Sequence, residues 1–410
     1  MTPKFVFGKE KNDWIKRPLL SNIEKILDYR GRTPKKLGLS WSDTGFLALS
    51  ALNVKNGYID FNADANYGDQ ELYNRWMGDN NLHKGQVVFT TEAPMGNVAQ
   101  IPNDALYILS QRTIAFEVKH HLIREDFLAT LLRSPKIFNE LTSLSSGGTA
   151  KGISQKSLSN LKISLPALLD EQSAIGSLFR TLDDLLASYK NNLANYQSLK
   201  ATMLSKMFPK DGEAVPEIRL DGFEGEWEVV NLGTLIESYD EIISGVSGFP
   251  IATSSRKGLY LQNDYFEGGR TGIDLTLDFH RVPIGYVTYR HMSDDSIFKF
   301  NKNNFETDVL VSKEYPVFIN NDNSDIDFLL YHLNNSRLFL RFSTMQKLGG
   351  TRVRLYYKNL ITYKLAVPTV KEQQAIGSYF SILDQLITSY REKITQLETL
   401  KKKLLQDMFI

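Results

Sequence analysis

The sequence contains no cysteine in its 410 residues. A disulfide framework and any thiolate metal site are therefore excluded, and the composition suits a reducing compartment. No stretch is long enough and free enough of charge to span a bilayer, and the first residues lack the apolar segment of a secretory signal. We therefore expect a soluble, cytoplasmic protein.

Recognisable catalytic signatures are missing as well. There is no phosphate loop of the G-x-x-x-x-G-K type, no G-x-G-x-x-G after a strand and no G-x-S-x-G elbow. The Asn/Asp-Pro-Pro-aromatic loop of amino-methyltransferases is also absent. None of the six histidines has metal-ligand spacing: His83, His120, His121, His280, His291 and His332. These absences weaken every catalytic hypothesis and disfavour a metal site.

Length and composition favour two or more globular domains, since 42% of the residues are hydrophobic and 11% are aromatic. The net charge of +1 does not by itself indicate a nucleic-acid partner. Charge is nevertheless uneven along the chain. Residues 1–40 carry ten Lys/Arg against four Asp/Glu, and residues 337–364 carry seven Lys/Arg and no acid. A solvated face explains any one such run taken alone.

An internal repeat is the clearest positive signal. Twelve of 19 positions are identical between EQSAIGSLFRTLDDLLASY (Glu171–Tyr189) and EQQAIGSYFSILDQLITSY (Glu372–Tyr390), 201 residues apart. Preceding strands that end at Pro166 and Pro368 match at a shift of 202, and the front ends match more weakly at a shift of 213. The repeat predicts two mixed α/β (α+β) modules in tandem, each followed by a long helix.

The two long helices carry apolar residues at intervals of three and four, which average about 3.6 residues. A long rod with one apolar stripe needs a partner, and we expect the two helices to pair as an antiparallel coiled coil. Thr369 to Glu372 forms a capping-box pattern at the start of the second helix. Gly176 and Gly377 predict close helix packing or a surface for another subunit. The predicted pairing residues are Ile175, Leu178, Leu182, Leu185, Tyr189, Ile376, Tyr379, Leu383, Leu386 and Tyr390.

Basic loops are the only candidates for binding chemistry. The segment Arg337–Lys364 interleaves Arg and Lys with aromatic residues and paired glycines, and Thr142–Ser164 is its less basic equivalent. Guanidinium groups can bind phosphates or guanine edges, and glycines let backbone N–H groups approach a phosphate. Asp28–Lys36 is a third basic loop, although a surface turn explains it nearly as well.

At this point the sequence resembles the specificity subunit of a Type I restriction–modification system. The resemblance rests on the E-Q-x-A-I-G helix starts at Glu171 and Glu372, on MFPK (Met207–Lys210) with the PEIRLDGFEGEWE that follows, and on VVFTTEAPMGNVAQI (Val87–Ile101). It covers essentially the whole chain. HMSDDSIFKF (His291–Phe300) lacks the EAPMGN pattern of the first module, which implies two recognition domains of different subtypes.

The resemblance implies two target-recognition domains that read the two halves of a bipartite DNA site, with the helices as a spacer. It implies two modification subunits, which methylate adenine at N6, and restriction subunits as partners. S-adenosylmethionine, ATP and Mg are then expected on those partners and not on this chain. The expected domains are residues 1–166 (first recognition domain), 167–208 (first spacer helix), 209–226 (linker), 227–368 (second recognition domain) and 369–410 (second spacer helix).

The candidate DNA-binding residues are basic side chains on or near these loops: Arg30, Arg32, Lys35, Lys36, Arg112, Lys151, Arg290, Lys347, Arg352 and Arg354. Three other functions stay open from the sequence. One is a stand-alone DNA-binding adaptor without partner subunits. The second is a coiled-coil scaffold whose globular ends bind protein, and the third is an enzyme with an unrecognised motif. DNA binding, partner assembly and turnover by the purified chain distinguish them.

Overall fold

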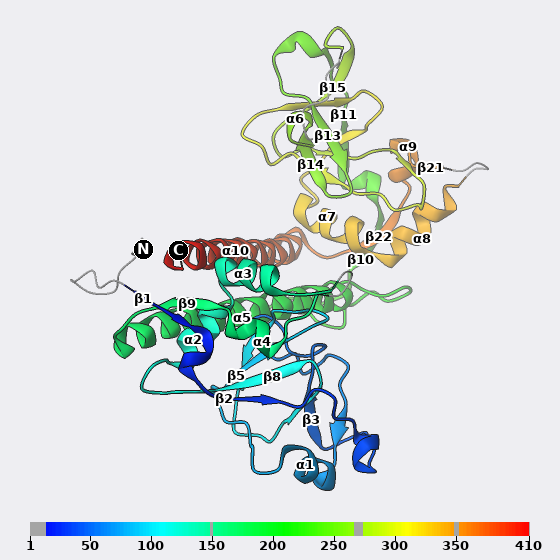
Figure 1. The fold of residues 1–410 in the computed structure, drawn as a ribbon. Helices are drawn as coiled ribbons and strands as arrows, with labels where there is room; N and C mark the ends of the chain where they lie inside the picture. The colour runs from blue at the N-terminus through cyan, green and yellow to red at the C-terminus, as the bar shows by residue number, and fades with distance from the viewer. Residues whose placement is uncertain (1–13, 148–150, 266–273, 348–351, 410) are drawn as a thin grey trace. The chain divides into compact units, whose positions relative to one another are not determined.

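A computed structural model describes residues 14–147, 151–265, 274–347 and 352–409 (Figure 1). The chain divides into two compact units. Unit 1 comprises residues 1–191 with 391–410, and unit 2 comprises residues 192–390. Each unit therefore contains one globular module together with a segment of both long helices, α5 (Leu169–Lys206) and α10 (Val370–Met408).

The module of unit 1 contains strands that form two main sheets. A four-stranded antiparallel sheet has the order β2-β8-β5-β6, and a three-stranded sheet has the order β4-β3-β7 with β3 and β7 parallel. The strands are β1 (Ile15–Pro18), β2 (Ile23–Asp28), β3 (Phe46–Leu49), β4 (Tyr67–Gly68), β5 (Val87–Thr90), β6 (Val98–Gln100), β7 (Ile108–Leu109), β8 (Thr113–Val118) and β9 (Lys162–Leu165).

Helices of the first module follow or interrupt these strands: η1 (Leu19–Asn22), η2 (Pro34–Leu37), α1 (Gln70–Met77), α2 (Glu125–Leu132), α3 (Pro135–Leu144) and α4 (Gln155–Ser159). The sequence predicts one helical stretch over Arg124–Leu144 that is interrupted at Pro135, and this is confirmed. Pro135 occupies the first turn of α3, where its missing N–H is not needed, and the Ser134 hydroxyl accepts from the backbone N–H of Ile137.

The module of unit 2 repeats the main sheet of unit 1. Its order β11-β20-β16-β18 corresponds strand for strand to β2-β8-β5-β6, and a second sheet has the order β12-β15-β19. The strands are β10 (Glu228–Asn231), β11 (Ile236–Tyr239), β12 (Ile242–Ser244), β13 (Ala252–Ser255), β14 (Gly258–Leu261), β15 (Asp278–Val282), β16 (Val287–Thr288), β17 (Met292–Ser293), β18 (Asn301–Lys302), β19 (Val309–Ser312), β20 (Val317–Asn320), β21 (Val353–Arg354) and β22 (Lys364–Val367).

Helices of the second module are η3 (Leu232–Thr234), η4 (Gly245–Ser247), α6 (Gln262–Tyr265), α7 (Ile326–Asn335), α8 (Arg337–Met345) and α9 (Tyr357–Leu360). The α7–α8 pair corresponds to α2–α3, and Ser336 caps α8 as Ser134 caps α3. The expected fold class is confirmed: two mixed α/β modules, each followed by a long helix.

Each module is framed by the strands through which the chain enters and leaves it. β1 pairs antiparallel with β9, with Ile15 opposite Leu165, and β10 pairs antiparallel with β22, with Glu228 opposite Val367. β9 and β22 lead directly into α5 and α10. The first and last strands of each module are therefore neighbours.

The apolar face of each long helix packs on the module that precedes it. Phe179 lies with Ile175 and Leu182 in the core of unit 1. Their equivalents Ile376, Phe380 and Leu383 lie in the core of unit 2. Phe179 and Phe380 have no exposed surface, although the predicted stripe omitted them. The helices thus form part of the two module cores as well as pairing with each other.

The predicted pairing residues differ in burial. Leu185 is 41% exposed, and Leu186 is buried in its place. Leu178 and Tyr379 are half-buried against the two cores, and Tyr189, Leu386 and Tyr390 are also half-buried. The buried residues of α5 include 175, 179, 182 and 186, so the predicted Ile175 and Leu182 lie on this face and Leu185 lies beside it.

Within each unit the two long helices run antiparallel. In unit 1, Lys401 contacts Asp183, and Lys190 Nζ lies 2.7 Å from Glu398 Oε1. In unit 2, Lys200 Nζ lies 2.5 Å from Asp384 Oδ1, and the rings of Tyr196 and Tyr390 lie 5.3 Å apart between centroids. Residue numbers rise along one helix as they fall along the other, so the expected antiparallel pairing is confirmed.

Asp183 and Asp384 occupy equivalent positions, as do Lys401 and Lys200. Each aspartate also binds a helix of its own module: Arg133 Nη1 lies 2.6 Å from Asp183 Oδ2, and the hydroxyl of Tyr331 donates to Asp384 Oδ2 at 2.8 Å. Burial and the hydrogen bond to Asp384 raise the pKa of Tyr331 well above its ordinary value. One carboxylate thus joins three helices in each unit.

A buried glutamine fixes the start of each long helix. Gln172 donates to the carbonyls of Leu122 at 3.1 Å and Pro166 at 2.9 Å, and it accepts from the backbone N–H of Arg124 at 2.9 Å. Gln373 makes the same three contacts in unit 2, to Asn323, Pro368 and Asp325. These hydrogen bonds tie the helix start to the preceding strand and to the start of α2 or α7.

The two helix glycines are sites of close packing. A Cβ atom at Gly176 would lie 2.9 Å from the backbone nitrogen of Phe127 in α2, and a Cβ atom at Gly377 would lie 3.2 Å from that of Phe328 in α7. Real Cβ atoms rarely approach so closely. Of the two interpretations given for these glycines, the structure supports close helix packing.

The capping box at the second helix is only half formed. The Thr369 hydroxyl accepts from the backbone N–H of Glu372 at 3.4 Å. The Glu372 carboxylate, however, is buried and bound by Arg219, whose Nε and Nη2 atoms each lie 2.7 Å from it. A bidentate guanidinium–carboxylate contact replaces the expected contact back to Thr369.

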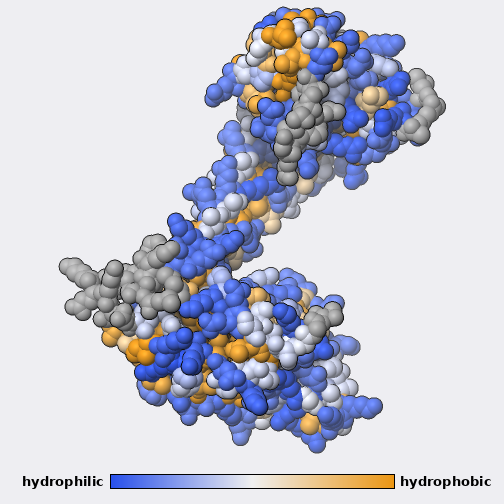
Figure 2. Space-filling view, turned by 45° about the horizontal axis from the view of Figure 1, so that its top comes forward, coloured by the Kyte–Doolittle hydropathy of each residue, from blue (hydrophilic) through white to orange (hydrophobic). Residues whose placement is uncertain are grey.

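Exposed apolar side chains gather at one edge of unit 2. Ile242, Val246, Leu275 and Leu277 are 44–69% exposed. Figure 2 shows apolar surface on this unit among mostly hydrophilic residues. None of the described helices combines the length and apolar character needed to cross a membrane.

Candidate DNA-binding interface

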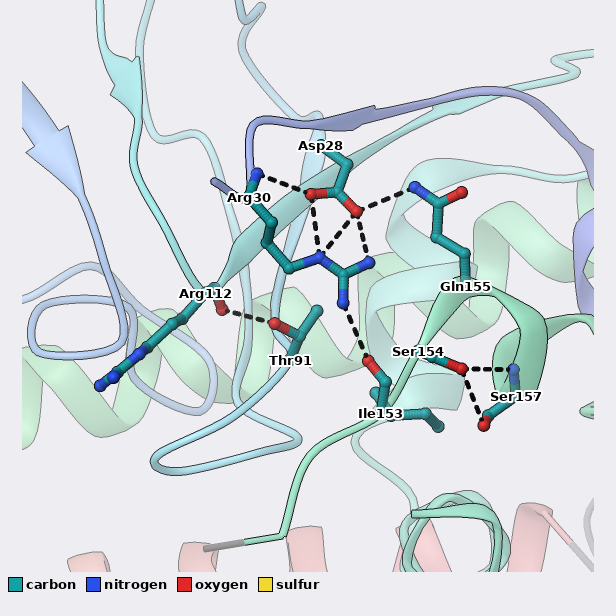
Figure 3. A network of polar contacts seen from close by, with 8 residues as sticks. All are labelled: Asp28, Arg30, Thr91, Arg112, Ile153, Ser154, Gln155 and Ser157. Atoms are coloured by element: carbon teal, nitrogen blue, oxygen red, sulfur yellow. Dashed lines mark hydrogen bonds and ion pairs between the residues drawn. The ribbon is translucent and has the colours of Figure 1, made fainter. Parts of the chain in front are cut away.

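Four loops of unit 1 meet near the end of β2 (Figure 3). Arg30 Nε donates to Asp28 Oδ2 at 2.8 Å, and its Nη1 atom donates to the carbonyl of Ile153 at 3.3 Å. Gln155 Nε2 also donates to Asp28, at 2.8 Å. Burial raises the pKa of Asp28, but the hydrogen bonds from Arg30 and Gln155 outweigh it, and the net pKa lies below the ordinary value. The Arg30 guanidinium therefore joins two loops.

The loop after β5 is held in the same cluster by Arg112, whose backbone adopts a left-handed φ of 67°. Its carbonyl accepts from the backbone N–H of Thr91 at 2.8 Å. Its side chain is 55% exposed, with Nε 3.2 Å from Glu92 Oε1, and it points away from the Asp28–Arg30 pair in Figure 3. Arg112 thus presents a guanidinium to solvent from a fixed backbone.

The loop before α4 completes this arrangement, which we call loop site 1 (residues 28–36, 91–97, 110–112, 145–147 and 151–155). Gly152 forms isolated antiparallel β-bridges with Glu92 and with Ser146. The N–H of Ile153 donates a hydrogen bond to the carbonyl of Thr91 at 2.9 Å. Exposed Lys151 adjoins Gly152. The predicted residues Arg30, Arg112 and Lys151 are therefore brought together from distant parts of the sequence.

The remaining predicted residues of the first module lie around η2. Arg32 contacts the carbonyl of Trp76, and its guanidinium carbon lies 4.5 Å from the centre of the Tyr29 ring. Lys36 Nζ donates to the carbonyl of Gly31 at 2.7 Å, and Lys35 is exposed beside it. All three side chains are exposed, and Arg32 also contacts Tyr29 and Trp76 of its own module.

Unit 2 has an equivalent arrangement, loop site 2 (residues 290–295, 347 and 352–356). β17 pairs with β21, with Met292 opposite Arg354, and the N–H of Leu355 donates to the carbonyl of His291 at 2.8 Å. This hydrogen bond corresponds to the one between Ile153 and Thr91. The two modules therefore hold their loops in the same way, although His291–Phe300 and the EAPMGN segment differ in sequence.

Four predicted residues belong to loop site 2: Arg290, Lys347, Arg352 and Arg354. Arg352 Nε lies 2.8 Å from Asp294 Oδ1, and Arg290 and Arg354 are exposed. Burial lowers the pKa of His291; Arg354 and Arg290 add to this effect and Glu314 opposes it. Lys347 is exposed, and Gly349, Gly350 and Thr351 of the predicted glycine-containing loop lie outside the described residues.

Sequence reasoning missed the carboxylates that hold these cations. Glu92 pairs with Arg112, Asp294 pairs with Arg352, and Asp295 pairs with Arg256 at 2.8 Å. Two of these pairs join residues more than 35 positions apart, so no local charge pattern indicates them. Among the described residues no cluster of three or more His, Asp and Glu could hold a metal ion.

The geometry thus consists of two solvent-facing basic loop sites on a duplicated framework. A model of the Type I restriction modification DNA specificity domain matches residues 21–195 and again residues 225–399. The chain belongs to this family. It is a DNA specificity protein with two recognition domains, and each matched range covers one module and most of the long helix that follows it.

Similar proteins bear the same description. The putative type I restriction enzyme MjaX specificity subunit of Methanocaldococcus jannaschii is 24% identical over 98% of this chain and 94% of its own length. The MjaVIII specificity subunit of the same organism is 23% identical over 73% of this chain and 72% of its own length. The crystal structure of the Type I S subunit from M. genitalium shares the fold, with a TM-score of 0.62 at 16% identity, covering 100% of this chain and 99% of that one.

Proposed function

We propose that this specificity protein reads a bipartite DNA target with one half-site per domain, and that loop sites 1 and 2 are the reading surfaces. The observation that carries the proposal is the shared backbone hydrogen bond, Ile153 to Thr91 and Leu355 to His291. It fixes the same loops in both domains, while the side chains that those loops present differ. A common frame with different side chains suits two different half-sites.

We further propose that the duplicated helix framework binds two copies of a modification subunit, an adenine-N6 methyltransferase, and that restriction subunits join this complex. The repeated Gln172/Gln373 and Asp183/Asp384 networks support this, because a two-fold repeat within one chain can offer the same surface twice. Catalysis, with S-adenosylmethionine, ATP and Mg, then belongs to the partners, and this chain acts in the cytoplasm as their non-catalytic DNA reader.

Co-expression with the modification subunit tests the proposal. The expected result is a complex with two modification subunits per chain, which methylates adenines in a split motif found by methylome sequencing. A methylome without a split adenine motif contradicts it. DNA binding by the purified chain without partner assembly would favour the adaptor, binding to protein alone would favour the scaffold, and turnover by the chain alone would favour an enzyme.

A further inference from the structure

Two adjoining cavities in unit 2 are lined by basic side chains. One has a volume of about 410 Å³ and the other about 520 Å³. Lys257 and Lys299 line both cavities, so the two share a wall. We call the pair the basic cleft.

The cleft is built from elements that the sheets of unit 2 hold in place. Lys257 lies in the turn between β13 and β14, and Lys299 lies two residues before β18. Arg290 follows β16 and belongs to loop site 2. The six cations that line the cleft are Lys200, Arg256, Lys257, Arg290, Lys299 and Lys302.

Each carboxylate that lines the cleft forms an ion pair. Asp294 binds Arg352, Asp327 binds Lys302, and Asp384 binds Lys200. Arg256, in turn, binds Asp295. Three cations are left: within the described part of the chain, the side chains of Lys257, Arg290 and Lys299 have no hydrogen-bond or ion-pair partner.

Lys299 is the least exposed of these three cations, since it is half-buried whereas Lys257 and Arg290 are exposed. Burial lowers the pKa of Lys299 and the nearby Lys200 adds to this effect, while Asp384 opposes it. An ammonium group in such a place gains more from an anion than one on an open surface, because water screens it less.

We propose that Lys257, Arg290 and Lys299 bind phosphates of the DNA backbone, and that the cleft extends the DNA contact of the second recognition domain beyond loop site 2. Continuity identifies the ligand as DNA: Arg290 and Asp294 line the cleft and are also part of loop site 2. Lysine ammonium groups act as point charges on phosphates and carry little base information. This inference rests on the proposed function.

Salt titration of DNA binding tests the cleft. The full chain is bound to a duplex with its split motif, and the dissociation constant is measured by fluorescence anisotropy over a range of salt concentrations. We expect Lys257→Ala with Lys299→Gln to lower the slope of log affinity against log salt by about 1 to 2, because each neutralised phosphate contributes roughly 0.9. Affinity should fall for every duplex, with base preference unchanged.

Lys313→Ala is the matched control, since Lys313 is an exposed lysine of the same unit that lines neither cavity. Lys257→Ala alone keeps the test valid if the half-buried Lys299 is needed for folding. Duplexes in which one phosphate at a time is replaced by a neutral methylphosphonate add a coupling test. At one position the replacement should lower the DNA affinity of the wild type but not that of the double variant.

The outcomes separate the two proposals. If the wild type binds DNA and the double variant has the same salt slope, phosphate binding by the cleft is overturned and the proposed function stands. A wild type that binds no DNA at any salt concentration overturns the proposed function, and the cleft with it. A reduced slope in the double variant, with a normal slope in Lys313→Ala, supports the cleft.

Discussion

The Nζ atom of Lys200 lies 2.5 Å from Asp384 Oδ1 in unit 2, and the equivalent Lys401 contacts Asp183 in unit 1. Each contact joins α5 to α10, and each aspartate also holds a helix of its own module, through Arg133 or Tyr331. The repeat therefore duplicates a junction of three helices, and this junction can be tested directly.

Asp183→Asn should destabilise the protein. The Arg133 side chain is only 7% exposed and would lose its carboxylate while staying charged, which should lower the free energy of unfolding by about 2–3 kcal/mol. Asp384→Asn should cost about 1 kcal/mol, because Asp384 is 43% exposed. Denaturant titration measures both.

Glu398→Gln is the control, since it breaks an exposed ion pair between the same two helices. It should change the free energy of unfolding by less than about 0.5 kcal/mol. A loss as large as that of Asp183→Asn would contradict the stabilising role of the three-helix junction.

Gly176→Ala should destabilise the protein by about 1–2 kcal/mol, because its Cβ atom would press on the backbone of α2. In an open helix the same substitution stabilises by roughly 1 kcal/mol, so the sign of the change distinguishes packing from a free surface. Ser177→Ala, at the exposed neighbouring position, serves as the control and should be neutral or slightly stabilising. Thermal unfolding of the two variants gives the comparison.

Gln373→Met should cost about 2–3 kcal/mol. The substitution keeps the side-chain length but leaves the carbonyls of Pro368 and Asn323 and the N–H of Asp325 without their partner. Gln374→Met changes the adjacent, exposed glutamine and should have little effect. If both variants lose the same free energy of unfolding, the three hydrogen bonds are not the cause.

Stability should fall below neutral pH because of His332. Burial lowers the pKa of this side chain to about 4, whereas its unfolded value is about 6.5. The unfolded chain therefore binds the proton more readily, and the stability present above pH 6.5 is lost as the pH falls toward 4. Between pH 7.5 and pH 5 the loss from this group is about 2 kcal/mol. Denaturant titration gives the free energy of unfolding at both pH values. The loss between pH 7.5 and pH 5 should be smaller by that amount in His332→Gln than in the wild type. An equal loss in the two proteins would contradict the assignment to His332.

Base reading should be separable by domain. Arg112→Ala should relax the methylation motif at one half-site, and Arg352→Ala or Arg354→Ala at the other, each with a discrimination loss of about 1–3 kcal/mol if the side chain contacts a base. Methylome sequencing of hosts that carry each variant checks this. Loss at both halves from a single substitution would contradict the assignment of one half-site to each domain.

Much of the framework could be predicted from the sequence, because its helices and its duplication are indicated by residues that lie close together in the chain. The repeat at a shift of 201 indicated two modules, Pro135 marked the break between α2 and α3, and the spacing of apolar residues located both long helices. Those signals depend on residues that are close in the chain. A helix follows its apolar period and begins at its capping residue whatever the rest of the fold is.

The parts that were missed depend on distant residues. Leu185 fits the apolar spacing, yet Phe179 and Leu186 define the buried face, because the position of the module core selects the face. Arg30 was predicted to bind DNA from its basic loop, and the sequence did not reveal that its guanidinium also joins Asp28 to the carbonyl of Ile153, 123 positions away. The charges Asp294 and Arg352 likewise meet only in the folded chain.

The framing strands have a consequence for how new specificities arise. Because β1 lies against β9 and β10 lies against β22, everything between each pair forms a cassette whose two ends meet in space. A recombination event with crossovers in these strands would replace one reading surface and leave the long helices and the other reading surface unchanged. The antiparallel strand pairs thus allow each recognition domain to be exchanged as a whole cassette, independently of the other.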